Sequence, residues 1–240
     1  VLTGDEHYAG KSPSQGTELC AVVEYMFSLE TAIAILGRAD IADRLERIAF
    51  NALPGTFSPD MWAHQYVQQA NQVVCRVSED RVYTNNGPDA NLFGLEPNYG
   101  CCTANMHQGW PKLAAHCWMR LPASGDTPAG LAAVAYAPCL INTEVNGKPM
   151  RVRVETDYPF RDTVRVTITG DGDFPVAFRI PGWTKGSTLQ VNDEEAVPTD
   201  PGTFYILQRA WQGDTTVTLR FPMTAKVEQR FNDSEAMSRG

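Results

Sequence analysis

A change in hydrophobic spacing near Pro122 limits the folds that this chain can adopt. Before that point, the apolar residues recur mostly at helical spacing. From about residue 131 their period becomes two, and turn residues such as Asn146 and Gly147 separate the apolar runs. Short alternating strands of this kind are typical of an antiparallel β-sandwich. The sequence therefore predicts an α+β chain, with helices over residues 18–120 and strands over residues 131–230.

Three helices are expected in the first half of the chain. They run from Glu18 to Leu36, with Gly37 as the residue that ends the helix, from about Asp40 to Leu53, and from about Thr103 to Met119. Pro111 falls within the third helix, so we expect this helix to kink or to begin late. Between the second and third helices, residues 65–77 are rich in strand-forming side chains and are predicted to be extended.

The charge composition indicates which kinds of molecule the chain could bind. The chain has 240 residues and a formal net charge of −8, without a run of lysine and arginine. An acidic chain of this kind is a poor match for nucleic acid or for an anionic membrane surface, whereas a neutral ligand such as a sugar fits better. We also expect no membrane span, because no apolar stretch approaches the roughly 18 residues that this requires.

Two adjacent cysteines, Cys101 and Cys102, follow Gly100 at the expected start of the third helix. A helix N-terminus lowers the pKa of a thiol, which makes the thiolate a better ligand and a better nucleophile. A disulfide between sequence neighbours would be strained, so metal binding or a reactive thiol is the better interpretation. The three cysteines Cys75, Cys117 and Cys139 lie among apolar residues and are expected to be buried.

A second motif, Glu18-Leu19-Cys20, lies at the expected start of the first helix. Three thiolates and one carboxylate could close a tetrahedral site, and zinc is the metal that prefers this mixture. Side chains two apart on a regular helix point about 200° apart, so Glu18 and Cys20 can share an ion only if this first turn is irregular. The alternative for Glu18 is a carboxylate that complements the helix dipole.

Other candidate residues lie in loops. Glu6, in a glycine-flanked loop, is a candidate general acid, and its neighbour His7 is a candidate ligand-binding residue; both could equally be solvated loop side chains. His64 and Tyr66, together with Trp62, could line a sugar pocket, and a structural hairpin is the rival interpretation.

The combination of these motifs resembles the β-L-arabinofuranosidase family of glycoside hydrolases, family 127. The resemblance lies in Glu-x-Cys at the head of an apolar helix, Cys-Cys-x-x-Asn at the head of a later one, and a β-sandwich after both. The segments Phe221-Pro222-Met223 and Ser238-Arg239-Gly240 also look like parts of that family. The resemblance implies that residues 1–125 form the C-terminal part of an (α/α)6 barrel and that residues 126–240 form a truncated β-sandwich.

The resemblance also implies roles for individual residues. It makes Glu18, Cys20, Cys101 and Cys102 the zinc ligands. Cys101 would also be the nucleophile, Glu6 would be the general acid and base with Asp5 as the alternative, and Tyr66, His64 and His7 would contact the substrate. The motif reads Glu-Leu-Cys here where Glu-Thr-Cys is common in the family, and the gap from Glu6 to Glu18 is shorter than expected. These departures suggest a divergent branch with another substrate.

The function expected from this resemblance is a zinc-dependent retaining glycoside hydrolase that acts on β-L-arabinofuranosides or related sugars. The alternatives are a non-catalytic protein, in which zinc is structural or the sandwich binds carbohydrate, and a redox thiol protein, although no Cys-x-x-Cys motif occurs. We expect the chain to be a segment of a longer protein and inactive by itself. A homodimer, and a location in the bacterial cytoplasm or periplasm, stay open.

Overall fold

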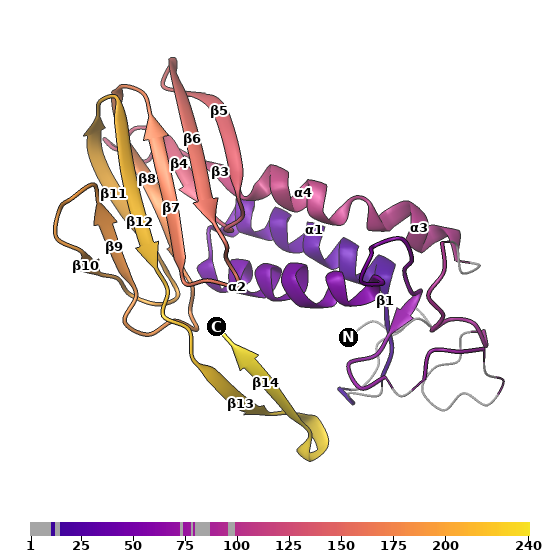
Figure 1. Ribbon diagram of the computed structural model, residues 1–240. Helices are drawn as coiled ribbons and strands as arrows, with labels where there is room; N and C mark the ends of the chain where they lie inside the picture. Colours follow the sequence, from indigo (N-terminus) through magenta and orange to yellow (C-terminus); the bar gives the residue numbers. More distant parts are fainter. Residues whose placement is uncertain (1–10, 13–14, 73, 78, 80–86, 96–98) are drawn as a thin grey trace. The chain divides into compact units, whose positions relative to one another are not determined.

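The computed structural model describes residues 11–12, 15–72, 74–77, 79, 87–95 and 99–240 (Figure 1). The chain divides into two compact units. The helical unit comprises Val1–Thr31, Leu45–Leu113 and Lys226–Ser238, and the sheet unit comprises Ala32–Arg44, Ala114–Ala225 and Arg239–Gly240. Together they form a mixed α+β structure in which strands predominate, in agreement with the predicted class at this level.

The first half of the chain contains the α-helices, together with two short helical turns. These are α1 (Leu19–Leu36), α2 (Ala39–Arg47), a π-helical turn (Ile48–Ala52), a 3-10 turn (Pro54–Thr56), α3 (Gly100–Met106) and α4 (Gly109–His116). Two short strands, β1 (Thr17–Glu18) and β2 (Val67–Gln68), form an antiparallel pair, and β13 (Ala225–Gln229) pairs with β14 (Glu235–Arg239) near the end of the chain.

Helix α1 begins one residue later than predicted, because Glu18 belongs to β1. Glu18 pairs with Val67 of β2, and the backbone N–H of Leu19 donates to the carbonyl oxygen of Tyr66 over 3.0 Å. The other end of the helix agrees with the prediction. Gly37 adopts a φ of +61°, and its N–H donates to the carbonyl of Ile33 over 2.8 Å, as expected for a helix-ending glycine.

The apolar character of α1 corrects one expectation from the sequence. Helix α1 has 18 residues and, by length and composition alone, could cross a membrane, so an apolar stretch of that length does exist. A core helix of a soluble protein meets the same criterion. Val23, Met26 and Ile33 of α1 are buried, whereas Tyr25, Ile35 and Leu36 are exposed, and 39% of the helix is buried in the structure.

The second and third predicted helices are shorter than expected. Helix α2 ends at Arg47, where the chain continues as the π-helical turn. The third helix is divided into α3 and α4, and Pro111 lies in the first turn of α4, where its missing N–H removes no internal hydrogen bond. The residues from Trp118 form a strand rather than the helix end, and within residues 65–77 the described strand is limited to β2.

The sheet unit contains a six-stranded and a four-stranded sheet. The order of the first is β10-β9-β12-β7-β6-β5, and all its neighbours are antiparallel. Its strands are β5 (Cys139–Val145), β6 (Lys148–Thr156), β7 (Thr163–Thr169), β9 (Thr188–Val191), β10 (Val197–Pro198) and β12 (Asp214–Arg220). The predicted alternation is confirmed here, because Val152 and Val154 of β6 are buried while Arg151, Arg153 and Glu155 between and beside them are exposed.

The four-stranded sheet departs from the expected antiparallel pattern. Its order is β11-β8-β4-β3, with β3 (Trp118–Leu121), β4 (Gly130–Ala133), β8 (Gly172–Ile180) and β11 (Thr203–Trp211). Strands β4 and β8 are parallel, with Leu131 opposite Val176. A parallel pair requires a long crossover connection, and here β5, β6 and β7 supply it. Period-two spacing gives no information on strand direction, so the sequence could not show this.

Aromatic rings fill part of the sheet unit's core. Tyr136, Tyr158 and Phe221 contact one another with ring centroids 5.4–6.3 Å apart, and Trp183 meets Phe221 edge to face. The hydroxyl of Tyr136 donates to the carbonyl of Arg179 over 2.6 Å, which satisfies the polar end of a buried ring.

A buried cation lies beside this cluster. Arg179 is 0% exposed; its Nε donates to the carbonyl of Val134 over 2.6 Å, and its guanidinium pairs with Asp43. The second carboxylate oxygen of Asp43 accepts from the N–H of Gly182 over 2.8 Å. The charge is thus neutralised and hydrogen-bonded, as a buried arginine requires.

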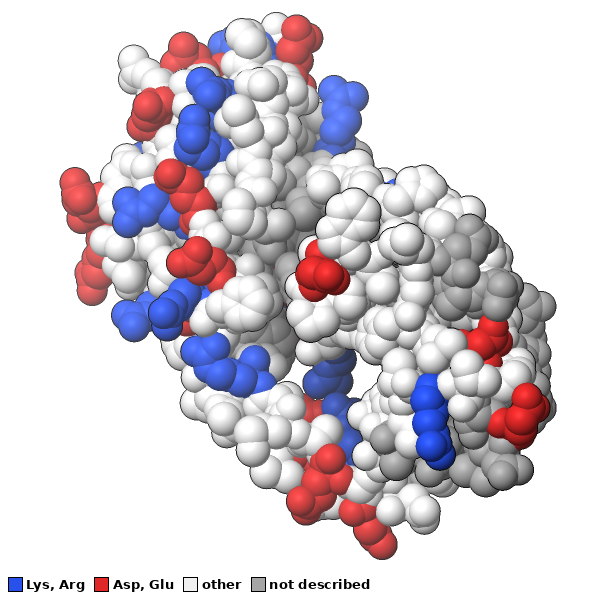
Figure 2. Space-filling model, turned by 45° about the vertical axis from the view of Figure 1, so that its right-hand side comes forward, with Lys and Arg blue, Asp and Glu red and all other residues white. Residues whose placement is uncertain are grey.

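The surface charge agrees with the composition. On the face shown in Figure 2, lysine and arginine side chains are interspersed with aspartate and glutamate. This mixed distribution does not provide the continuous basic stripe that nucleic acid would require on this face.

Candidate metal centre

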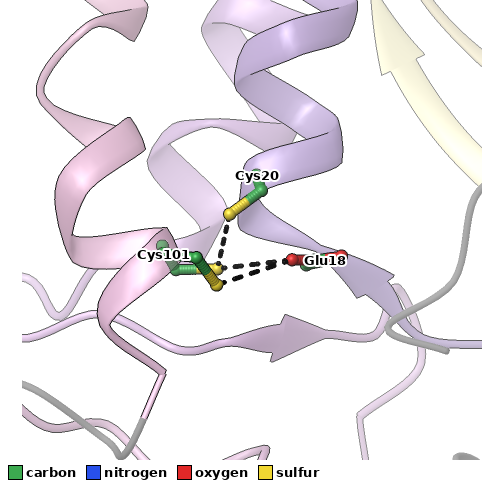
Figure 3. A group of neighbouring side chains, drawn as sticks. Glu18, Cys20 and Cys101 are labelled. Atoms are coloured by element: carbon green, nitrogen blue, oxygen red, sulfur yellow. Dashed lines mark hydrogen bonds between the residues drawn. The ribbon is translucent and has the colours of Figure 1, made fainter. Parts of the chain in front are cut away.

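The structure brings Glu18, Cys20, Cys101 and Cys102 together in the helical unit (Figure 3). One ligand atom from each, a carboxylate oxygen and three Sγ atoms, lies within 4.8 Å of all the others. The two motifs that the sequence placed at separate helix starts therefore converge in space.

The local folding of each motif explains how the four side chains meet. Glu18 extends from β1, whereas Cys20 is the second residue of α1, so the change from strand to helix occurs between them. This is the irregular first turn that the sequence required if both residues were to face one ion. Cys101 and Cys102 are the second and third residues of α3.

The distances within the cluster are close to those around a tetrahedral ion, with the Cys20–Cys102 sulfur pair shorter and the contacts of Glu18 longer. In a tetrahedral zinc site with bonds of about 2.3 Å to sulfur and about 2.0 Å to oxygen, neighbouring ligand atoms lie about 3.5–3.8 Å apart. The Sγ atoms of Cys20 and Cys102 are 3.2 Å apart, and Oε1 of Glu18 lies 3.9 Å from the Sγ atoms of both Cys101 and Cys102. With three sulfurs and a carboxylate as donors, both the chemistry and the size of the cluster suit zinc.

The four residues differ in exposure. Cys102 is 0% exposed and Glu18 is 5% exposed, whereas Cys20 is half-buried and Cys101 is exposed. A molecule approaching from solvent would therefore reach the sulfur of Cys101 more readily than that of Cys102.

The thiol pKa values do not follow the expectation from the helix N-terminus. Hydrogen bonding to Cys102, with a smaller contribution from Asn105, lowers the pKa of Cys20 to about 5. The pKa of Cys101 is raised by burial and then by its hydrogen bond with Cys20, and that of Cys102 is raised above all by its hydrogen bond with Cys20. Among the three thiols, Cys20 is therefore the first to ionise, and its negative charge disfavours ionisation of Cys101 and Cys102.

Asn105, the asparagine of the Cys-Cys-x-x-Asn motif, contacts this cluster, although the sequence analysis assigned it no role. Its Nδ2 donates to Sγ of Cys20 over 3.2 Å, and its Oδ1 accepts from Nε2 of Gln108 over 3.1 Å. A signal was present in the sequence, because Asn105 follows Cys101 by four residues and Cys102 by three, and such residues share one face of a helix.

His64 and Tyr66, predicted to contact the substrate, are both buried beside the segment that leads into α3. Nε2 of His64 lies 3.0 Å from Oγ1 of Thr103, the residue after Cys102. The ring of Tyr66 stacks on that of Tyr99, with centroids 3.8 Å apart. Trp62, which the sequence grouped with them, is 76% exposed.

The remaining predicted site residues lie outside the part of the chain that the structure describes. These are the candidate acid Glu6, its alternative Asp5, and His7. Among the other cysteines, Cys117 is buried as expected and Cys139 is partly buried, but the expectation is wrong for Cys75, which is exposed and donates to the carbonyl of Asn91.

Comparison with known protein families finds a match within the second half of the chain. Residues 130–223 match the family model described as "Beta-L-arabinofuranosidase, GH127 middle domain". The resemblance to family GH127 is confirmed. The matched segment covers β4 to β12 and does not include the four residues of the cluster.

Solved structures of GH127 proteins share the fold. Ara127N-Se, a GH127 β-L-arabinofuranosidase from Geobacillus stearothermophilus T6, superposes with a TM-score of 0.75 at 23% identity, over 96% of this chain and 36% of that one. A protein described as a glycoside hydrolase gives a TM-score of 0.76 at 22% identity, over 94% and 37%. BT3674, a GH127 β-arabinofuranosidase, gives 0.71 at 21% identity, over 94% and 36%.

The chain thus spans 36–37% of the length of these solved structures. A search of curated proteins found no match. At these identities the likeness to the solved structures concerns the fold.

Proposed function

We propose that this chain is part of a zinc-dependent retaining glycoside hydrolase that acts on β-L-arabinofuranosides or related sugars. The observation that carries the proposal is the convergence of Glu18, Cys20, Cys101 and Cys102 within 4.8 Å, in a chain that also matches the GH127 middle domain. The names of two solved structures with this fold, both arabinofuranosidases, support the substrate class.

The four residues would hold zinc, and a bound zinc ion would keep the coordinating thiols deprotonated at neutral pH. This matters for Cys101, the proposed nucleophile, because its own surroundings raise its pKa. We assign the role of nucleophile to Cys101 rather than Cys102, since Cys101 is exposed and Cys102 is fully buried.

The proposed reaction has two steps. In the first, Sγ of Cys101 forms a bond to the anomeric carbon while the bond to the leaving oxygen breaks, and Glu6 donates a proton to that oxygen. In the second, Glu6 accepts a proton from water, the water oxygen attacks the anomeric carbon, and the carbon–sulfur bond breaks. Two displacements at one carbon retain its configuration, and a thiolate replaces the carboxylate nucleophile that is usual in retaining glycosidases.

Other parts of the proposal extend the resemblance. Asp5 is the alternative to Glu6 as the acid, and His7, His64 and Tyr66 are proposed to contact the sugar. The buried positions of His64 and Tyr66 beside the start of α3 fit the wall of a site better than its open rim. For the whole protein we propose an (α/α)6 barrel that includes residues 1–125, followed by a β-sandwich that includes residues 126–240.

The experiment that tests the proposal uses the complete protein with an aryl β-L-arabinofuranoside. A Cys101→Ser variant should lose turnover, whereas the matched Cys139→Ser variant, altered in β5, should keep it. Glu6→Gln should slow the second step, so that digestion and mass spectrometry find a sugar attached to Cys101. Undiminished turnover by Cys101→Ser would refute the role of Cys101 as the nucleophile.

A structural role for zinc is the second candidate. The burial of Cys102 and Glu18 favours it, because an inaccessible cluster joining distant segments can hold a fold together without reacting. If so, Cys101→Ser would lower stability, and the complete wild-type protein would cleave no arabinoside.

A further inference from the structure

Asn105 has no role in the reaction described above, yet both ends of its side-chain amide are engaged beside the cysteine cluster. Nδ2 donates to Sγ of Cys20, and Oδ1 accepts a hydrogen bond from the side chain of Gln108. Asn105 lies near the end of α3, whereas Cys20 lies in α1, so this N–H···S bond joins the two helices that carry the thiols.

The hydrogen bond from Gln108 fits the orientation in which the nitrogen of the Asn105 amide faces the sulfur. Nε2 of Gln108 can only donate, so it requires the oxygen of Asn105 on its side, at 3.1 Å. The nitrogen of Asn105 then points to Cys20. The backbone reinforces this arrangement, because the N–H of Gln108 also donates to the carbonyl of Asn105 over 3.0 Å.

The negative charge of the proposed metal centre explains what the hydrogen bond from Asn105 to Cys20 would contribute. Three thiolates and a carboxylate around a divalent ion leave a formal charge of −2, and such an excess is costly in a half-buried site unless donors compensate it. An N–H that donates to a coordinating sulfur stabilises part of the negative charge on that sulfur. It also orients the cysteine side chain.

We propose that Asn105 is a positioning residue for Cys20: its amide N–H, oriented by Gln108, directs the thiolate toward the metal and stabilises its charge. This inference rests on the proposed zinc site. It concerns the affinity and geometry of the site rather than the identity of the sugar.

The alternative is that Asn105 only stabilises the turn between α3 and α4 through its bond with Gln108. Asn105→Asp separates the two roles. A carboxylate at this position still accepts the hydrogen bond from Gln108, but it presents an oxygen to Cys20 instead of a donor. A purely structural role would therefore tolerate this variant, and a positioning role would not.

The experiment measures zinc affinity by competition with a chelator, together with the thiolate-to-cobalt charge-transfer spectrum of the cobalt-substituted chain. We expect Asn105→Asp to weaken zinc binding about 10- to 100-fold and to shift the charge-transfer band. Gln108→Glu should act in the same direction, because a carboxylate at 108 attracts the nitrogen of Asn105 and turns it away from the sulfur.

The matched control is Asn51→Asp. Asn51 is exposed, and its side-chain nitrogen donates to a backbone carbonyl, that of Arg47, over 2.8 Å. This variant introduces the same charge in the same unit without touching the cluster, and it should leave both measurements unchanged.

Wild-type zinc affinity and an unshifted spectrum in Asn105→Asp would overturn the inference while leaving the metal site intact. Absence of zinc binding by the wild-type chain would instead refute the metal centre, and with it the role of Asn105. If circular dichroism shows that Asn105→Asp does not fold, Gln108→Glu decides, since it keeps Asn105 in place.

Discussion

The sulfur atoms of Cys20 and Cys102 lie 3.2 Å apart, although 82 residues separate them in the sequence. Cys20 belongs to α1 and Cys102 to α3, so an ion held by both would cross-link two helices that are separated in the sequence by α2, two short helical turns and β2. The stability of the helical unit is therefore expected to depend on whether a metal ion is bound between the two sulfurs and the other donors of the cluster.

Zinc should therefore stabilise the chain. An ion that binds the folded form alone raises its stability in proportion to the logarithm of the ion concentration over its dissociation constant. We expect the thermal midpoint of the wild-type chain to fall when a chelator removes zinc and to recover when zinc is restored. Cys102→Ser should abolish this difference, and Cys139→Ser should preserve it; an equal response in both variants would argue against the site.

Cys20 should be the most readily ionised thiol of the metal-stripped cluster. Its pKa is lowered to about 5, mainly by the hydrogen bond with Cys102, whereas the pKa values of Cys101 and Cys102 are raised. The alkylation rate of Cys20 should consequently change little between about pH 6 and about pH 8, where an ordinary thiol reacts faster with each step in pH. Peptide mass spectrometry after iodoacetamide treatment would identify the alkylated cysteine. A steep rise in the alkylation rate of Cys20 with pH over this range would contradict the lowered pKa.

The contact between His64 and Thr103 should support the start of α3. Thr103→Val removes the hydroxyl that lies 3.0 Å from Nε2 of the buried His64 and leaves this nitrogen without its partner, at a cost of about 1–3 kcal/mol. Thr103→Ser keeps the hydroxyl and should cost less. Chemical denaturation of the two variants measures the difference, and equal stabilities would show that the hydrogen bond contributes nothing.

Glu228 should make the helical unit sensitive to acid. Its hydrogen bond with Ser238, followed by that with Lys226, lowers its pKa from 4.5 to about 2, and Arg47 and Arg230 add further positive charge. Because the folded pKa is below the unfolded value, this contribution is complete above pH 4.5 and is lost as the pH falls toward 2.

The test compares the wild-type chain with Glu228→Gln by denaturation at several pH values. We expect a difference in stability near neutral pH that shrinks as the solution becomes acidic and also shrinks in high salt, since the surrounding cations are largely exposed. A difference that is independent of pH would assign the effect to something other than the charge of Glu228.

The ion pair of Asp43 with Arg179 should be asymmetric in its response to mutation. Asp43→Ala leaves a guanidinium that is 0% exposed without its counter-charge and should cost about 3–5 kcal/mol. The double variant Asp43→Ala with Arg179→Met removes the charge as well and should recover part of the loss. Urea denaturation measures both, and a double variant less stable than Asp43→Ala would contradict this explanation.

The sequence predicted those features that depend on local pattern. Alternating residues in β6, and the turn at Asn146 and Gly147, where both residues have positive φ, appear where expected. The convergence of the Glu18 and Cys101 motifs followed from the ligand preferences of zinc and from the family resemblance, not from periodicity.

Features that depend on tertiary contacts could not be predicted in this way. The parallel pairing of β4 with β8 and the pKa changes among the thiols are determined by residues distant in the sequence. The division of the third helix before Gly109 is different, because Pro111 gave a local signal for a kink or a late start. The contact of Asn105 with Cys20 also joins positions 85 apart, although its spacing from the tandem cysteines places Asn105 on their face of α3.

The change from strand to helix between Glu18 and Cys20 gives a criterion for comparing related sequences. One residue, Leu19, separates the carboxylate that leaves β1 from the thiol that enters α1. An insertion or deletion at this point would turn one of the two proposed ligands away from the other donors of the cluster. Sequences that keep the tandem cysteines but alter this one-residue gap should therefore be set apart as candidates for proteins that have lost the metal and the chemistry that depends on it.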